Sequence, residues 1–233
     1  MYSQAVAGAP NQYESTWRLK QIIRNKLNQD ENANPISYED IKGSPYFPNK
    51  VQLGEVSVAD SLYGMHLMRY NIYTDEVEIY ADEEYDLSNS DKKFEAKYAL
   101  LKLDNSEVAF SDVTLKYFSY LDYDNVPKSS YFLETFKGSK FSLLCKKRCV
   151  LTPAQKAASP NHPGRAAKFI IYDDYYIYNH KNNKTNKLLL KKKSLKVLFP
   201  NNADKLHSYI KKHKVKLKNK SSLIEFLTYL NKI

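Results

Sequence analysis

Alternation of apolar and polar side chains along residues 43–190 is the feature that most restricts how this chain can fold. Residues 68–72 alternate apolar and polar positions, Thr74-Asp75 follows, and the alternation resumes over residues 76–79. A period of two places the two sets of side chains on opposite faces of a strand. We therefore predict a β-hairpin with an inward apolar face and an outward polar face. The outward face should carry Arg69, Asn71, Glu76 and Glu78.

Further hairpins are predicted along the same segment, each around a short polar turn. The first turn is Asp104-Asn105-Ser106, between strands 98–103 and 108–117. The second turn is 137–140, between strands 131–136 and 141–150. The third turn is Asp173-Asp174, between the short strands 169–172 and 175–178. A turn at Asn182-Asn183 precedes a strand over 187–190, and a shift in apolar parity indicates a β-bulge near Ser111-Asp112. Sequential hairpins without alternating helices predict an α+β fold, mainly an antiparallel β meander closed as a sandwich or a partly open barrel.

The segment before the β domain, residues 1–42, is predicted to be a flexible start followed by an N-terminal helix. Its apolar stripe consists of Trp17, Leu19, Ile22, Ile23 and Leu27. Such a stripe usually packs on a core, so we expect it to lie against the main domain.

The last segment, residues 191–233, is predicted to form Lys-rich helices that pack on the β domain of residues 43–190. Ser194 and Asn202 are expected to cap the first two helices. A capping box is expected at the start of the last helix, from Ser222 and Glu225. The apolar stripe that follows it is Leu223, Phe226, Leu227 and Leu230.

The formal charge of +10 is concentrated in the last third of the chain. Residues 1–167 hold 20 Lys and Arg against 22 Asp and Glu, whereas residues 168–233 hold 16 Lys, no Arg and 4 acidic residues. A basic segment of this kind is either a binding face for an anionic partner or a solvated surface. Nucleic acid is the least favoured partner, because recognition of bases and phosphates favours the bidentate arginine fork.

Two groups of residues are candidates for binding a partner. Aromatic clusters on strands can form interfaces, although they can equally pack in a core. The candidates are Tyr172, Tyr175, Tyr176 and Tyr178 on the predicted strands, and Lys211, Lys212, Lys214, Lys216 and Lys218 between the predicted helices.

Motifs for catalysis, metal or cofactor binding are not found, so no catalytic, metal or cofactor residue is nominated. The pattern around Asp122-Tyr123-Asp124-Asn125 lacks the glycine and the terminal glutamate of a calcium loop. Cys145 and Cys149 lie on one strand about 13 Å apart, too far for a disulfide or for sharing a metal. No run of about 18 apolar residues offers a transmembrane helix. The five histidines, His66, His162, His180, His207 and His213, are scattered.

Two segments carry a resemblance to a known group of proteins. Gly43-Ser44-Pro45-Tyr46 and residues 68–78 resemble a pattern in exported single-domain proteins of Bacteroidetes, which run GSPY, then a strand, then LRYNIYTDEMEF or a close variant. The resemblance continues over residues 131–144 and over the Lys-rich stretch 209–218, and it covers roughly residues 38–233. It implies a signal-bearing precursor and a periplasmic or outer-membrane-associated location. It carries over no catalytic residues.

We therefore expect a non-enzymatic binding or accessory protein of the envelope, of which a subunit docked on an outer-membrane translocon or transporter is one concrete form. Its expected partner is another envelope protein, with an anionic membrane surface as a further candidate. An envelope polysaccharide hydrolase is the enzyme alternative, and a nucleic-acid-binding protein that uses the basic last third is the second alternative. The start of the chain lacks a signal peptide. The location would thus be the periplasm if the signal has been removed, and the cytoplasm if Met1 is native.

Overall fold

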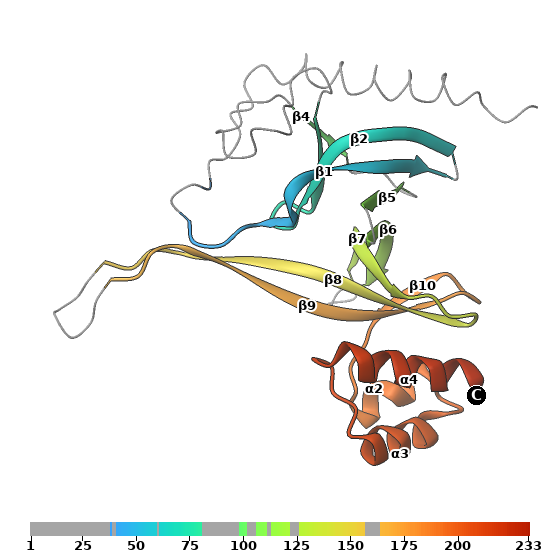
Figure 1. The fold of residues 1–233 in the computed structure, drawn as a ribbon. Helices are drawn as coiled ribbons and strands as arrows, with labels where there is room; N and C mark the ends of the chain where they lie inside the picture. Colours follow the sequence, from blue (N-terminus) through green and yellow to red (C-terminus); the bar gives the residue numbers. More distant parts are fainter. Residues whose placement is uncertain are drawn as a thin grey trace, which may run out of the picture. The chain divides into compact units, whose positions relative to one another are not determined.

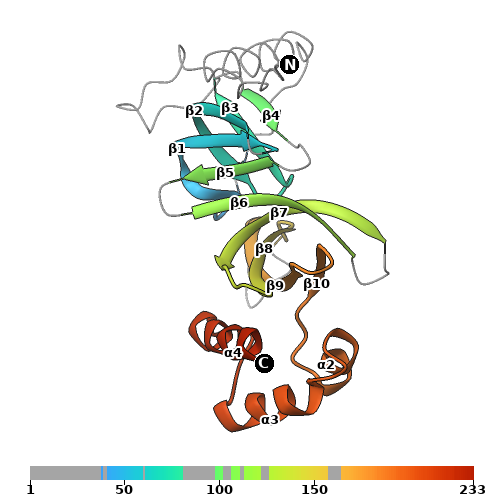
Figure 2. The ribbon, with the colours of Figure 1, turned by 90° about the vertical axis from the view of Figure 1, so that its right-hand side faces the viewer.

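The computed structural model describes residues 38, 41–59, 61–80, 98–101, 106–110, 113–121, 126–156 and 164–233. The described chain forms two compact units, divided after β5 and again near residues 150 and 170. Both units are built from antiparallel strands, and the second also carries three helices (Figures 1 and 2). The predicted α+β fold with an antiparallel β meander is thus confirmed.

The first unit contains five strands in the order β5-β1-β2-β3-β4. Their bounds are β1 Tyr46–Val58, β2 Ser61–Asn71, β3 Glu76–Tyr80, β4 Tyr98–Leu101 and β5 Ser106–Phe110. The predicted hairpin over residues 68–79 is confirmed, because β2 pairs with β3 and Arg69 lies opposite Glu78. The left-handed backbone of Asp75 and the Asn71 side chain, which accepts from the amides of Tyr73 and Thr74, build its turn.

The predicted hairpin around Asp104-Asn105-Ser106 is wrong. Strand β4 pairs with β3, whereas β5 pairs with β1, so the two strands lie at opposite edges of this unit. The β5–β1 pairing buries Val108 and Phe110 completely, a long-range gain that local sequence does not reveal. The predicted strand over 108–117 is divided between β5 and β6, and the bulge expected at Ser111-Asp112 lies outside the described residues.

The second unit contains a five-stranded meander in the order β6-β7-β8-β9-β10. The bounds are β6 Val113–Leu121, β7 Pro127–Phe136, β8 Phe141–Thr152, β9 Lys168–Asn179 and β10 Lys184–Lys187; the ends of β8 and β9 beyond Val150 and before Ile170 belong to the first unit. The predicted hairpin of 131–136 with 141–150 is confirmed as β7–β8. Strand β10 lies beside β6, so this meander curls back on itself (Figure 2).

The two short strands predicted around Asp173-Asp174 are instead the single strand β9. Acidic residues within a strand are tolerated here because cations on the neighbouring strands pair with them. Lys147 Nζ lies 2.9 Å from Asp173, while Arg148 Nε and Lys187 Nζ lie 3.2 and 3.1 Å from Asp174.

The turn at Asn182-Asn183 is confirmed, with Asn183 in the left-handed region. The strand after it spans Lys184–Lys187, which is three residues earlier than the predicted 187–190. The strand begins earlier because pairing with β9 starts directly after the turn, where Lys184 lies opposite Asn179. The Tyr178 hydroxyl also donates to Asn183 in this turn.

Three helices follow β10: α2 Lys192–Leu198, α3 Ala203–His213 and α4 Lys220–Lys232. We call residues 191–233 the helical cap. The prediction that Ser194 caps the first of these helices is wrong, because Ser194 lies inside α2. Asn202 does occupy the N-cap position of α3, without a side-chain capping bond. The capping box is also wrong, since α4 begins earlier, where Asn219 Oδ1 accepts from the Ser222 amide at 2.9 Å.

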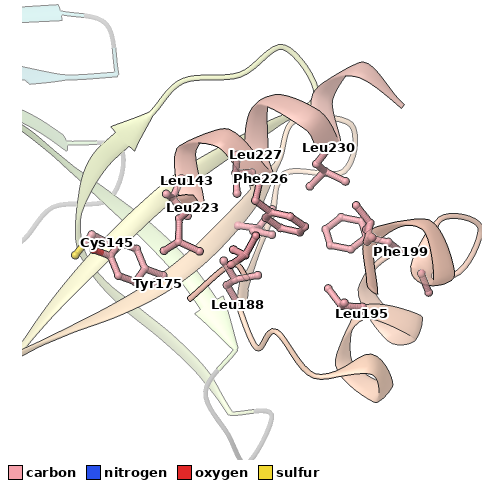
Figure 3. Packing of buried hydrophobic residues seen from close by; sticks show 14 residues of the cluster. Leu143, Cys145, Tyr175, Leu188, Leu195, Phe199, Leu223, Phe226, Leu227 and Leu230 are labelled. Carbon is pink, nitrogen blue, oxygen red and sulfur yellow. The ribbon is translucent and has the colours of Figure 1, made fainter. Parts of the chain in front are cut away.

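The helical cap packs on β8 and β9 through one continuous apolar core. The predicted stripe of α4 is fully buried there, against Leu143, Ile177 and Leu188 of the strand segment and Leu195 and Leu206 of the other helices. Figure 3 shows Leu223, Phe226 and Leu227 turned toward this core. Each such large side chain contributes about 1.5–3 kcal/mol when it is buried, so the cap is firmly held on the sheet.

The N-terminal helix predicted around Trp17 lies outside the described residues. Among the described helices, none has the length and apolar character needed to cross a membrane.

Candidate binding sites

The tyrosine candidates fall into two groups in the structure. Tyr175 is buried in the core under the helical cap. Tyr176 is buried inside the curled meander, where its ring centroid lies 5.1 Å from that of Phe132. Tyr178 is half-buried, and only Tyr172 is well exposed, at 44%. Two of the four candidates therefore pack in the core and present no surface to a partner.

The lysine candidates are all exposed. Lys211 and Lys212 lie in the last turn of α3, and Lys214, Lys216 and Lys218 lie in its connection to α4. Val215 is buried between these lysines and its amide donates to the Ile210 carbonyl at 3.1 Å. This anchored apolar residue holds the connection on the core, so the lysines on either side extend into solvent.

The helical cap carries a charge equal to that of the entire chain. Residues 191–233 contain twelve lysines and two acidic residues, Asp204 and Glu225, which is +10 for the cap and zero for the remainder. Asp204 is already paired with Lys192 Nζ at 3.2 Å, and this contact lowers the pKa of the Asp204 carboxyl. Charges this dense reinforce one another within a Debye length of about 8 Å at physiological salt.

Stacked aromatic rings tie α3 to α4. The Tyr209 ring lies parallel to that of Tyr229 with centroids 4.2 Å apart, and His213 stacks on Tyr209 at 4.2 Å. Burial, followed by the Glu225 charge, raises the pKa of the Tyr209 hydroxyl. The end of α3, where the lysines begin, is thereby fixed against the last helix.

Asn231 anchors the helical cap to the turn between β7 and β8. Its Oδ1 accepts from the amides of Lys140 and Phe141 at 2.8 and 3.0 Å, and its Nδ2 donates to the carbonyls of Phe141 and Leu227 at 2.9 and 2.8 Å. Gly138 leaves the space for this contact, since a Cβ there would lie 2.6 Å from Asn231 Nδ2.

Another candidate site lies in the first unit, around the buried carboxylate of Glu78. We call Tyr46, Arg69, Asn71, Glu78 and Tyr80 the second site. Glu78 is only 1% exposed, and its oxygens accept from Arg69 Nε at 2.7 Å, the Tyr80 hydroxyl at 2.7 Å and Asn71 Nδ2 at 3.2 Å. The sequence placed Arg69, Asn71, Glu76 and Glu78 on an outward face. That prediction is wrong for Asn71 and Glu78, because three donors compensate for the burial of the carboxylate.

Aromatic rings hold Arg69 in this second site. The guanidinium Cζ lies 3.4 Å from the centroid of Tyr46 and 5.6 Å from that of Tyr80. Burial acts to lower the pKa of Arg69, but Glu78 and the two tyrosines outweigh it, and the pKa is raised. Burial and the Glu78 charge raise the pKa of Tyr80 far above its usual range, so its hydroxyl stays a donor.

Two segments that are distant in the sequence meet in this site. Tyr46 belongs to the GSPY segment, whereas Arg69, Asn71 and Glu78 belong to the segment 68–78. The backbones also join, since the Ile72 amide donates to the Pro45 carbonyl at 2.8 Å. Sequence reasoning did not bring these residues together in one site, because the local pattern does not show that the two segments pair.

Both cysteines are free. Cys145 lies in the core under the helical cap, and burial together with the Asp173 carboxylate raises its pKa to about 12. Burial also raises the pKa of Cys149, which is half-buried. These thiols are therefore protonated and weakly nucleophilic at neutral pH.

Histidines and acidic residues form no metal site within the described ranges, where no group of three or more possible ligands occurs. His66 is buried with its Nε2 3.1 Å from the Tyr63 carbonyl oxygen, and His180 Nε2 lies 2.9 Å from the Ser142 hydroxyl. His162 and the segment 122–125 lie outside the described residues.

No protein-family model, curated protein or solved structure matches this chain. The arrangement of its own residues is therefore the basis for a functional proposal.

Proposed function

We propose that this chain is a non-enzymatic binding protein of the cell envelope, whose helical cap docks on an acidic surface of a partner protein. One observation carries the proposal: the entire net charge lies on residues 191–233, which are anchored on a folded core. A charged surface with a fixed shape selects a partner of complementary charge and speeds their encounter.

The rigidity of the helical cap favours binding over simple solvation. The stack of Tyr209 on Tyr229 and the Asn231 contacts restrict the backbone that carries the lysines. Lysines on a fixed backbone lose less entropy on binding than lysines on a flexible tail. An envelope location is supported by the resemblance of residues 43–46 and 68–78 to exported proteins of Bacteroidetes.

The alternative that the chain is a polysaccharide hydrolase is not supported by Asp173 and Asp174, the acidic pair at the centre of β9. A glycosidase needs two carboxyl groups that converge on one sugar. Asp173 and Asp174 are consecutive in a strand, so their side chains leave on opposite faces, and each is paired with a cation. A nucleic-acid role is less favoured because every cation of the cap is a lysine.

Two charge-reversal variants test the proposal. In the cap variant, Lys211, Lys212, Lys214 and Lys216 are replaced by Glu; in the control, the same change is made at the exposed Lys42, Lys50, Lys156 and Lys168 of the first unit. Both variants lower the net charge equally. Cells that produce each form are cross-linked and fractionated, and the proteins that travel with the chain are identified by mass spectrometry.

The expected result is one envelope protein that is recovered with the wild type and the control but lost with the cap variant. Equal recovery with all three forms would refute docking through the cap. Recovery of a cytosolic partner would refute the envelope location, and salt-sensitive recovery of RNA or DNA would favour the nucleic-acid alternative.

A further inference from the structure

The second site offers hydrogen-bond donors that the protein does not use. A guanidinium has five N–H donors in a fixed plane. In the described part of the chain, Arg69 uses its Nε for Glu78, and its terminal nitrogens have no hydrogen-bond partner. The Arg69 side chain is 17% exposed, so the guanidinium group is not fully enclosed by the described protein. The terminal nitrogens of Arg69 can therefore donate to an acceptor from outside the protein, which would replace water.

The guanidinium is held in place before any ligand arrives. Tyr46 covers one face at 3.4 Å, and Glu78 fixes the Nε edge from a position held by Asn71 and Tyr80. The rotamer entropy of a long side chain is therefore already lost in the folded protein. A planar acceptor with two oxygens matches the remaining donors in a bidentate geometry.

The charge of the site selects a carboxylate over a phosphate. Arg69 and Glu78 together are formally neutral, so the site offers directed donors rather than a strong positive field. A singly charged, planar carboxylate fits such a site, whereas a doubly charged phosphate favours several cations.

Two exposed apolar side chains lie further along the same face of β1 and β2, beyond Leu67, which is buried with Val51 and Tyr80. Met65, Leu67 and Arg69 alternate on this face, and Leu53 of β1 lies opposite Leu67. Leu53 and Met65 are 53% and 50% exposed, and the strand register makes them diagonal neighbours on this face. Glu55 lies opposite Met65 and disfavours an acidic group at that end. A ligand would therefore lie with its carboxylate at Arg69 and its apolar group at Met65.

We propose that the face of β1–β3 around Arg69, Leu53 and Met65 binds a peptide segment that carries a carboxylate and, about 13 Å away, an apolar side chain. This spacing corresponds to four residues of an extended chain. The proposal is independent of the basic cap, because none of its residues belongs to residues 191–233. The peptide-binding proposal and the proposal of docking through the cap can therefore be refuted independently of each other.

The test uses the full chain labelled with ¹⁵N and the peptide Ac-Asp-Ala-Ala-Ala-Leu-NH₂. Nuclear magnetic resonance follows the Arg69 Nε signal and the amides of Leu53 and Met65 as the peptide is added. The matched control peptide has Asn in place of Asp. A third peptide, Ac-Leu-Ala-Ala-Ala-Ala with a free C-terminus, distinguishes a terminal carboxylate from a side-chain carboxylate.

The expected result is a saturable shift of these signals with at least about tenfold weaker binding of the Asn peptide. Arg69→Lys keeps the positive charge beside Glu78 but removes the planar fork, and it should weaken binding by a similar factor. Met65→Ser changes an exposed side chain, leaves the fold intact and should weaken binding about fivefold. Equal binding of the Asp and Asn peptides, or no shift up to about 5 mM peptide, would overturn the proposal.

Discussion

Replacement of Asn231 by alanine tests how the helical cap is attached to the β sheet. The change removes four hydrogen bonds, of which three, to the amide and carbonyl of Phe141 and to the carbonyl of Leu227, are half-buried. The Leu227 carbonyl keeps a partner, because it also accepts the backbone hydrogen bond of the helix. Each half-buried group left without a partner costs about 1–1.5 kcal/mol, and water replaces the exposed bond to Lys140. Alanine regains about 0.5 kcal/mol through its higher helix propensity. The expected loss in the free energy of unfolding is therefore about 2 kcal/mol.

Urea denaturation followed by circular dichroism measures this loss, and hydrogen exchange at the Phe141 amide locates it. The neighbouring Lys232→Ala is the matched control, because Lys232 is an exposed residue of the same helix and should change stability by less than about 0.5 kcal/mol. An Asn231→Ala loss as small as that of the control, with unchanged protection of Phe141, would refute the anchoring role.

Three further predictions concern Glu78, Cys145 and Gly138. Glu78→Ala leaves the Arg69 cation without its counter-charge and should cost about 3–5 kcal/mol, against a small effect of Glu76→Ala; equal thermal stability of the two variants would contradict this. Because the pKa of Cys145 is raised to about 12, the unfolded chain loses this proton first as pH rises above about 9, and stability falls between these values. From pH 8 to 10 the wild type should lose about 1 kcal/mol more than Cys145→Ala in urea denaturation, and parallel losses would count against the buried thiol. Gly138→Ala forces a Cβ into an occupied space and should lower stability by about 2 kcal/mol, whereas an unchanged urea midpoint would show that the turn is not tightly packed.

Local sequence patterns correctly predicted two hairpins, in each of which the paired strands are adjacent in the sequence. The hairpin of β2 with β3 and that of β7 with β8 follow from alternation and a turn between adjacent strands. The pairing of β5 with β1 was missed, because its gain comes from burying Val108 and Phe110 on a strand about fifty residues earlier. Local turn signals carry no information on such partners.

Charged residues were the second source of error. Asp173-Asp174 has the composition of a turn, but cations on β8 and β10 allow it to continue a strand. Glu78 has the position of a solvent-facing residue, but donors from Arg69 and Asn71 allow it to be buried. In both cases the compensating groups lie on other strands. The local sequence therefore predicts a turn or an exposed side chain where the structure has a continuous strand or a buried one.

The candidate binding residues were predicted in part by composition. The lysines of the segment 211–218 are exposed because buried Val215 alternates with them, a pattern that is visible in the sequence. The tyrosine cluster was ambiguous, since strand residues of this type serve cores and interfaces equally well. The helical cap buries Tyr175, the curled meander buries Tyr176, and Tyr172 is left exposed. These outcomes depend on tertiary contacts, which the local sequence does not reveal.

Docking through the helical cap is tested most directly by a photo-cross-linker placed on it. Benzoylphenylalanine is incorporated in place of Lys211 on the cap or, as a control, in place of the exposed Lys50 on β1, and cells are irradiated. The account predicts a single discrete protein adduct from position 211, with an acidic surface on the captured protein, and none from position 50. Identical adducts from both positions, or adducts with lipid or nucleic acid alone at position 211, would contradict it.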